Sequence, residues 1–157
     1  MYPEACMTAV KIVYSSCGGN TELVCQKVAQ LVEAGGHEVS LHDAKLFGPE
    51  ILEGDEVLVL ASPTYGVGEL ERFMAKLLYK ADKMDFTDRP CAVISLGDEK
   101  YHQDYFLESM RLLAVYLKKR GAKFVTGPLM IGKHPASHLE TTVPQWTERF
   151  LQGLNKQ

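Results

Sequence analysis

Short runs of apolar residues recur along the chain, and their length and composition are typical of β-strands. Residues 10–14 predict a strand, and the nearly uniform apolar runs at 57–60 and 91–96 predict strands buried inside a parallel sheet. Residues 39–42 alternate between apolar and polar side chains, which indicates a half-buried strand at a sheet edge. Residues 123–125 predict the last strand.

Longer amphipathic stretches separate these strands. Apolar side chains recur at helical spacing in residues 24–32, 70–78, 106–117 and 143–154. Glycine follows the first of these stretches and also the third, as is common where helices end. Because β and α units alternate along the whole chain, the sequence predicts an α/β fold, with a doubly wound parallel sheet and helices on both faces. The pattern leaves the order of the strands open.

The length and composition fit one ordinary α/β domain. The chain has 157 residues, of which 46% are hydrophobic and 24% charged. We expect a single domain over residues 1–157, with residues 1–8 as an N-terminal tail and Met7 as an alternative start to Met1. The first residues lack the basic and apolar stretches of a secretion signal, and no apolar run approaches the ~18 residues of a membrane helix.

Charge and cysteine content narrow the functional classes. A net charge of −3 argues against a nucleic-acid partner, because such partners are captured by clustered Lys and Arg. The four cysteines form no C-x-x-C pair, and the histidines show no spacing typical of metal ligands. We therefore expect a reduced, cytoplasmic setting, no metal site and no membrane partner.

The loop after the first strand, residues 15–22 with the sequence SSCGGNTE, consists mainly of small residues. Ligands of doubly wound sheets bind beyond the carboxyl ends of the strands, where this loop lies. Its backbone N–H groups and the helix start that follows can surround an anion, with the hydroxyls of Ser16 and Thr21 as further donors. The loop contains no Lys or Arg, and the GxxxxGK[ST] and GxGxxG patterns are both absent. A phosphate bound here is held by neutral groups.

A cysteine nucleophile is the alternative function for this loop, since Cys17 precedes a helix start that lowers thiol pKa values. Small cysteine phosphatases need an arginine six residues further on, and this chain has Leu23 there. We therefore interpret Cys17 as a small loop residue.

Aromatic residues follow two further strands. Residues 61–69, ASPTYGVGE, place Tyr65 between a proline-stiffened approach and two glycines, and residues 96–106, LGDEKYHQDYF, combine acids with aromatic rings. Each loop alone also fits a simpler interpretation. The loop at 61–69 fits a surface turn, and the loop at 96–106 fits a helix start whose acidic residues favour the helix dipole. Together with the phosphate loop, they describe a site for a flat aromatic ligand with a phosphate tail.

The three loops together resemble those of the flavodoxins, and the resemblance runs from Val10 to Leu154. The segment SSCGGNTE is similar to the family's phosphate loop, (S/T)xTGNTE. The segment PTYG is similar to the loop that carries the first flavin-stacking aromatic residue. The GD pair at 97–98, with the tyrosines that follow it, is similar to the second stacking loop. Gly18 and Cys17 replace threonines that are common in the family, and at Gly18 we expect one hydroxyl contact to phosphate to be missing. The chain has no long insertion after the fifth strand, and in this it resembles the short-chain subgroup of the family. The resemblance implies a flavodoxin-like five-stranded sheet of order 2-1-3-4-5 and non-covalently bound FMN.

The resemblance also implies which residues contact FMN. Tyr65 stacks on one face of the flavin, and Tyr101 on the other, with His102 as the alternative if the third loop is aligned from its far end. Gly66 is expected to let the following peptide rotate when the flavin is reduced. The implied cofactor-binding residues are Ser16, Cys17, Gly18, Gly19, Asn20, Thr21, Ser62, Pro63, Thr64, Tyr65, Gly66, Leu96, Gly97, Asp98, Tyr101, His102 and Tyr105.

The function implied by the resemblance is that of a low-potential one-electron carrier with no substrate of its own. Acidic residues around the flavin, Glu69 among them, oppose the gain of negative charge and so lower the potential. We expect a monomer that shuttles electrons between a flavin- or ferredoxin-type reductase and redox acceptor proteins, which it meets transiently. The alternative is a flavin-dependent quinone or NAD(P)H oxidoreductase of the same fold. Two stacked rings, one on each flavin face, argue against it because they leave no open face for a substrate.

Overall fold

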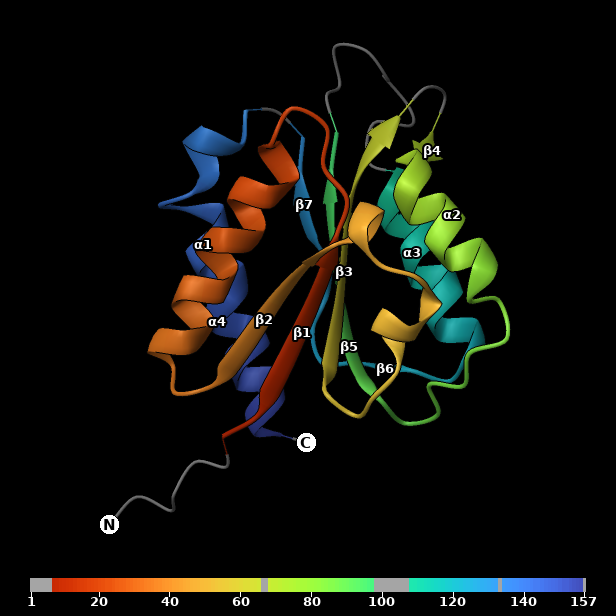
Figure 1. The fold of residues 1–157 in the computed structure, drawn as a ribbon. Coiled ribbons are helices and arrows are strands. Elements are labelled where there is room, and N and C mark those ends of the chain that lie inside the picture. The colour runs from red at the N-terminus through yellow and green to blue at the C-terminus, as the bar shows by residue number, and fades with distance from the viewer. Residues whose placement is uncertain (1–6, 66–67, 98–107, 133, 157) are drawn as a thin grey trace.

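The computed structural model describes residues 7–65, 68–97, 108–132 and 134–156, and it shows a sheet between two layers of helices (Figure 1). The strands are β1 (Ala9–Tyr14), β2 (Glu38–Asp43), β3 (Val57–Tyr65), β4 (Glu69–Leu70), β5 (Pro90–Leu96), β6 (Lys123–Phe124) and β7 (Leu129–Ile131). The helices are α1 (Asn20–Ala34), α2 (Arg72–Lys80), α3 (Glu108–Lys119) and α4 (Thr142–Asn155), and short 3-10 helices are η1 (Ala44–Leu46), η2 (Pro49–Leu52) and η3 (Pro135–His138).

The main path of the sheet runs β2-β1-β3-β5-β6, and all neighbours along it are parallel. With β5 and β6 counted as the fourth and fifth predicted strands, this order confirms 2-1-3-4-5. The alternating strand at 39–42 lies within β2, at the sheet edge as predicted. Because the strands are parallel, the carboxyl ends of β1, β3 and β5 meet at one edge, at the top of Figure 1. The loops that carry the predicted site therefore begin side by side.

A separate hydrophobic core lies on each face of the sheet. Helices α1 and α4 cover one face, where Trp146 and Phe150 are buried and their rings stack 5.2 Å apart (Figure 1). Helices α2 and α3 cover the other face, where Met74, Leu113 and Leu117 are fully buried. Most of the predicted apolar positions that lie within these helices pack in the two cores, whereas Phe106, predicted at the start of the third helix, lies outside the described residues. This packing fixes the strand ends, and with them the positions of the loops.

The predicted fifth strand is interrupted in the structure. β6 ends at Phe124, and the chain rejoins β5 as β7, whose Ile131 pairs with Leu96. The intervening segment packs against α4, where a Cβ on Gly153 would lie only 2.1 Å from the Val125 carbonyl oxygen. The Trp146 indole N–H also donates to a backbone carbonyl of this segment, at 2.7 Å. The sequence analysis did not predict β7, a strand of only three residues that pairs with the end of β5.

The helix predicted over residues 70–78 begins later than expected. Leu70 lies in β4, antiparallel to β3 and paired with Thr64, so placing it in the helix was wrong. Glu71 precedes α2, and its carboxylate accepts hydrogen bonds from the backbone N–H groups of Phe73 and Met74, at 2.8 and 3.2 Å. These bonds start the helix at Arg72. Among the described residues, no helix is both long and apolar enough to span a membrane.

Candidate functional site

The first loop forms a turn between β1 and α1. Gly18 and Gly19 have φ angles of 75° and 85°, in the left-handed region that favours glycine. No heavy atom beyond their chain neighbours lies within 4 Å of where a Cβ would stand on either residue, so open space adjoins this stretch of backbone. Gly19 is also the N-cap of α1 and has no side chain to bond the first helical N–H groups. This arrangement leaves backbone donors available to an anion.

Thr21 supplies the most informative side chain of this loop. The residue is only 1% exposed, and its hydroxyl oxygen has no hydrogen-bond partner among the described residues. Buried hydroxyls are nearly always paired in folded proteins. An unpaired one in the first turn of a helix, next to two left-handed glycines, fits a phosphate as the missing partner.

Ser16 in the loop and Tyr14 at the end of β1 both contact Glu22 in the first turn of α1. The Ser16 hydroxyl oxygen accepts the backbone N–H of Glu22 at 3.5 Å, a long contact that caps the helix start. Burial, the negative charges of Glu22 and Asp43 and a hydrogen bond to Glu22 raise the pKa of Tyr14 to about 12. The Tyr14 hydroxyl therefore stays protonated at neutral pH.

The second loop begins at the end of β3, where Ser62 and Thr64 are buried and Tyr65 is half-buried. Burial, a hydrogen bond with Cys17 and the nearby charge of Glu71 together raise the pKa of Tyr65 to about 12. The ring is therefore neutral at physiological pH. The contact with Cys17 places Tyr65 directly beside the first loop, as the predicted site requires.

Two residues that the sequence patterns did not indicate join these loops. The Ser15 hydroxyl donates to Ser62 Oγ at 3.3 Å, and its backbone N–H donates to the Ala61 carbonyl at 3.0 Å. The backbone N–H of Glu71 also donates to Ser62 Oγ, at 3.3 Å. Ser15 and Glu71 are both buried. Ser15 lies 47 residues from Ser62 and Glu71 lies nine residues from it, and neither contact follows a local motif.

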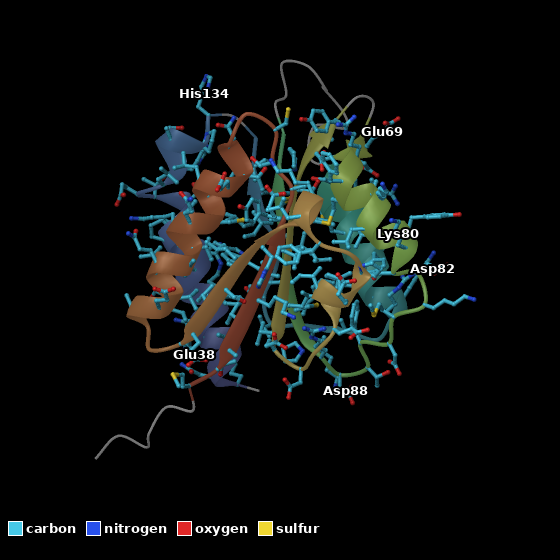
Figure 2. All side chains as sticks on the ribbon, in the orientation of Figure 1. Glu38, Glu69, Lys80, Asp82, Asp88 and His134 are labelled. Atoms are coloured by element: carbon cyan, nitrogen blue, oxygen red, sulfur yellow. The ribbon has the colours of Figure 1, made fainter. Side chains whose placement is uncertain are left out.

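The third loop begins at the end of β5. Leu96 is buried, and the Gly97 N–H donates to the Ile131 carbonyl at 3.0 Å, which anchors the loop start to β7. Figure 2 shows Glu69 and His134 at the end of the molecule where these loops lie, and Glu38 and Asp88 at the opposite end. Glu69 thus lies at the predicted edge. Among the described residues, no group of three potential His, Cys, Asp or Glu ligands is placed to hold a metal ion.

The geometry can be compared with that of known proteins. The family model described as "Flavodoxin" matches residues 12–146, which span both the strand order and the three loops. The chain belongs to the flavodoxin family. Flavodoxins are electron-transfer proteins rather than enzymes, which agrees with the carrier function implied by the loop sequences.

Curated and solved flavodoxins cover most of the chain. Flavodoxin 2 of Escherichia coli is 28% identical over 134 residues, covering 85% of this chain and 73% of that protein. Oxidised flavodoxin 2 from Bacillus cereus has a TM-score of 0.83 and 27% identity, covering 92% of this chain and 99% of that one. A flavodoxin of Fusobacterium nucleatum, solved bound to flavin mononucleotide, has a TM-score of 0.75 at 20% identity and covers 90% of this chain and 96% of that one, a likeness of fold alone. These matches support a short-chain flavodoxin.

The structure brings together part of the flavodoxin site predicted from the sequence. Residues 16–21, 62–65 and 96–97 all end or follow strands whose carboxyl ends share one edge. The remaining predicted positions, Gly66, Asp98, Tyr101, His102 and Tyr105, lie outside the described residues. The choice between Tyr101 and His102 as the second stacking ring therefore stays a prediction.

Proposed function

We propose that this flavodoxin binds FMN non-covalently at the carboxyl edge of its sheet and carries single electrons at low potential. The observation that carries the proposal is the buried, unpaired Thr21 hydroxyl beside the two left-handed glycines. The FMN bound to the Fusobacterium nucleatum flavodoxin of the same fold supports the choice of cofactor. When bound, FMN supplies reversible one-electron chemistry.

Each loop has a distinct task in this proposal. Backbone N–H groups of residues 16–21 and the Thr21 hydroxyl bind the phosphate without any ion pair. Tyr65 covers one face of the flavin, and Tyr101 or His102 covers the other. The backbone of residues 62–64 and 96–98 meets the ribityl chain and the edge of the ring. The half-buried position of Tyr65, beside the phosphate loop, supports its role.

The residues around the site also bear on its potential. The first loop contains no Lys or Arg, and Glu69 lies at the same end of the molecule (Figure 2). A carboxylate near the flavin opposes the arrival of negative charge, and solvent reduces the effect without reversing it. This charge distribution supports a low-potential carrier.

The proposed partners are a flavin- or ferredoxin-type reductase as donor and redox proteins as acceptors, each met transiently by a monomer. We place this exchange in the cytoplasm. Cys17, Cys25 and Cys91 are free thiols, and the last two are buried, which supports a reducing compartment.

The purified protein tests the proposal directly. We expect a yellow protein with flavin absorption, release of FMN on acid treatment, and rebinding of FMN much tighter than of riboflavin. A colourless protein that takes up no FMN would overturn the proposal. Mixing the FMN-loaded protein with NADPH, without a reductase, separates the carrier from the oxidoreductase alternative. A carrier leaves NADPH unoxidised, whereas rapid oxidation would show an enzyme.

A further inference from the structure

A cluster of buried hydroxyls lies beneath the second and third loops. Ser62 and Thr64 come from the end of β3, Ser95 from the end of β5, and Ser109 from the first turn of α3. Ser62, Ser95 and Ser109 are 0% exposed and Thr64 is 5% exposed. Burying several hydroxyls in one place is costly unless each is hydrogen-bonded, so their pairing needs an explanation.

Ser109 is the centre of this cluster. Its hydroxyl donates to the Ser62 carbonyl at 3.0 Å and accepts from the Thr64 hydroxyl at 3.0 Å. A hydroxyl has one proton and two lone pairs. The short contact between the Ser95 and Ser109 hydroxyls is therefore donated by Ser95. The backbone N–H of Ser109 completes the pairing by donating to Thr64 Oγ1, at 3.1 Å. The hydrogen-bonding capacity of the Ser109 side chain is fully used.

These bonds join the elements that position the site. Thr64 directly precedes Tyr65, Ser62 lies three residues before it, and Ser95 directly precedes the start of the third loop at Leu96. Ser62 Oγ in turn accepts from Ser15, at the start of the first loop. A single side chain on α3 thereby ties together the ends of β3 and β5.

We propose that Ser109 is a positioning residue for the flavin site, holding in place the ends of β3 and β5, from which the second and third loops leave. This proposal rests on the proposed FMN-binding function. Preorganised loops lose less freedom on binding, so the hydroxyl of Ser109 increases flavin affinity without touching the flavin. The first loop binds phosphate through its own backbone and Thr21. The hydrogen bonds of Ser109 reach the ends of β3 and β5 and not residues 16–21, so we expect Ser109 to affect binding of the ring and not of the phosphate.

The test compares FMN and riboflavin affinities, measured by quenching of flavin fluorescence. We expect Ser109→Ala to weaken both ligands by about tenfold, leaving their affinity ratio unchanged. The visible absorption maxima of the bound flavin should also shift, because the ring contacts change. Thr147→Val is the matched control. Thr147 is equally buried, its hydroxyl donates to the Val143 carbonyl at 2.8 Å, and α4 covers the opposite face of the sheet.

The outcomes separate this proposal from the proposed function. If the unsubstituted protein binds no flavin, both fail. If it binds FMN and Ser109→Ala binds both flavins equally well with an unchanged spectrum, only the role of Ser109 is overturned. The same conclusion follows if Thr147→Val weakens flavin binding as much, because then general destabilisation explains the loss. Should Ser109→Ala not fold, Ser95→Ala removes one of the same bonds and is expected to weaken both flavins in the same ratio.

Discussion

Replacing Thr21 with valine tests how the phosphate is held. Valine keeps the shape of threonine but has no hydroxyl, and Thr21 is buried with its hydroxyl oxygen unpaired among the described residues. In the flavin-free protein the substitution removes a buried polar group that lacks a partner. We therefore expect the free energy of unfolding to stay unchanged or to rise by up to about 1 kcal/mol.

FMN binding should respond in the opposite direction. The lost hydroxyl is expected to donate a hydrogen bond to a charged phosphate, worth about 1–2 kcal/mol. The dissociation constant of FMN should therefore rise about 5- to 30-fold. Riboflavin has no phosphate, so its affinity should not change. This opposite pair of effects distinguishes a ligand contact from a structural one.

The measurements are flavin fluorescence titrations of both ligands and urea denaturation of the flavin-free protein. Thr147→Val is the control, because the hydroxyl of this buried threonine already has a partner in the Val143 carbonyl. It should keep the wild-type affinities without stabilising the protein. The reasoning is refuted if Thr21→Val binds FMN as tightly as the unsubstituted protein, or if it loses FMN and riboflavin affinity equally.

Three further substitutions have defined outcomes. Tyr65→Ala should cost about 1–3 kcal/mol of affinity for both FMN and riboflavin in the same titrations, by analogy with base stacking on aromatic rings, and unchanged riboflavin binding would exclude stacking. Gly153→Ala should lower the free energy of unfolding by about 1–2 kcal/mol in urea, because the methyl group meets the Val125 carbonyl and this outweighs the gain in helix propensity. Burial lowers the pKa of His42 below 6.5, so the unfolded chain binds the proton at higher pH. The stability contributed by neutral His42 is complete above pH 6.5 and is lost as the pH falls through the folded-state pKa. His42→Gln should therefore reduce the change in the free energy of unfolding between about pH 7.5 and about pH 5.5, measured by urea denaturation.

Much of the candidate site followed from local sequence. Glycines that need left-handed backbone, a hydroxyl at each end of a loop and an aromatic residue before a glycine all mark positions within a few residues of one another. The structure places Gly18 and Gly19 in that conformation and buries Thr21 beside them. The network around Ser109 leaves no such mark. Ser62 is 47 residues from Ser15 and 47 from Ser109, and only folding makes them neighbours.

The sequence by itself determined the alternation of strands and helices, the edge position of residues 39–42 and the loops that carry the chemistry. These features depend on side-chain periodicity and turn residues, which act over short distances along the chain. Only the tertiary structure decided that the chain pairs with β5 a second time as β7, and that the Val125 backbone packs closely on Gly153. It also decided that Leu70 pairs with Thr64 in β4 instead of joining α2. Contacts between distant segments are chosen by packing and hydrogen bonding in three dimensions, which a one-dimensional pattern does not record.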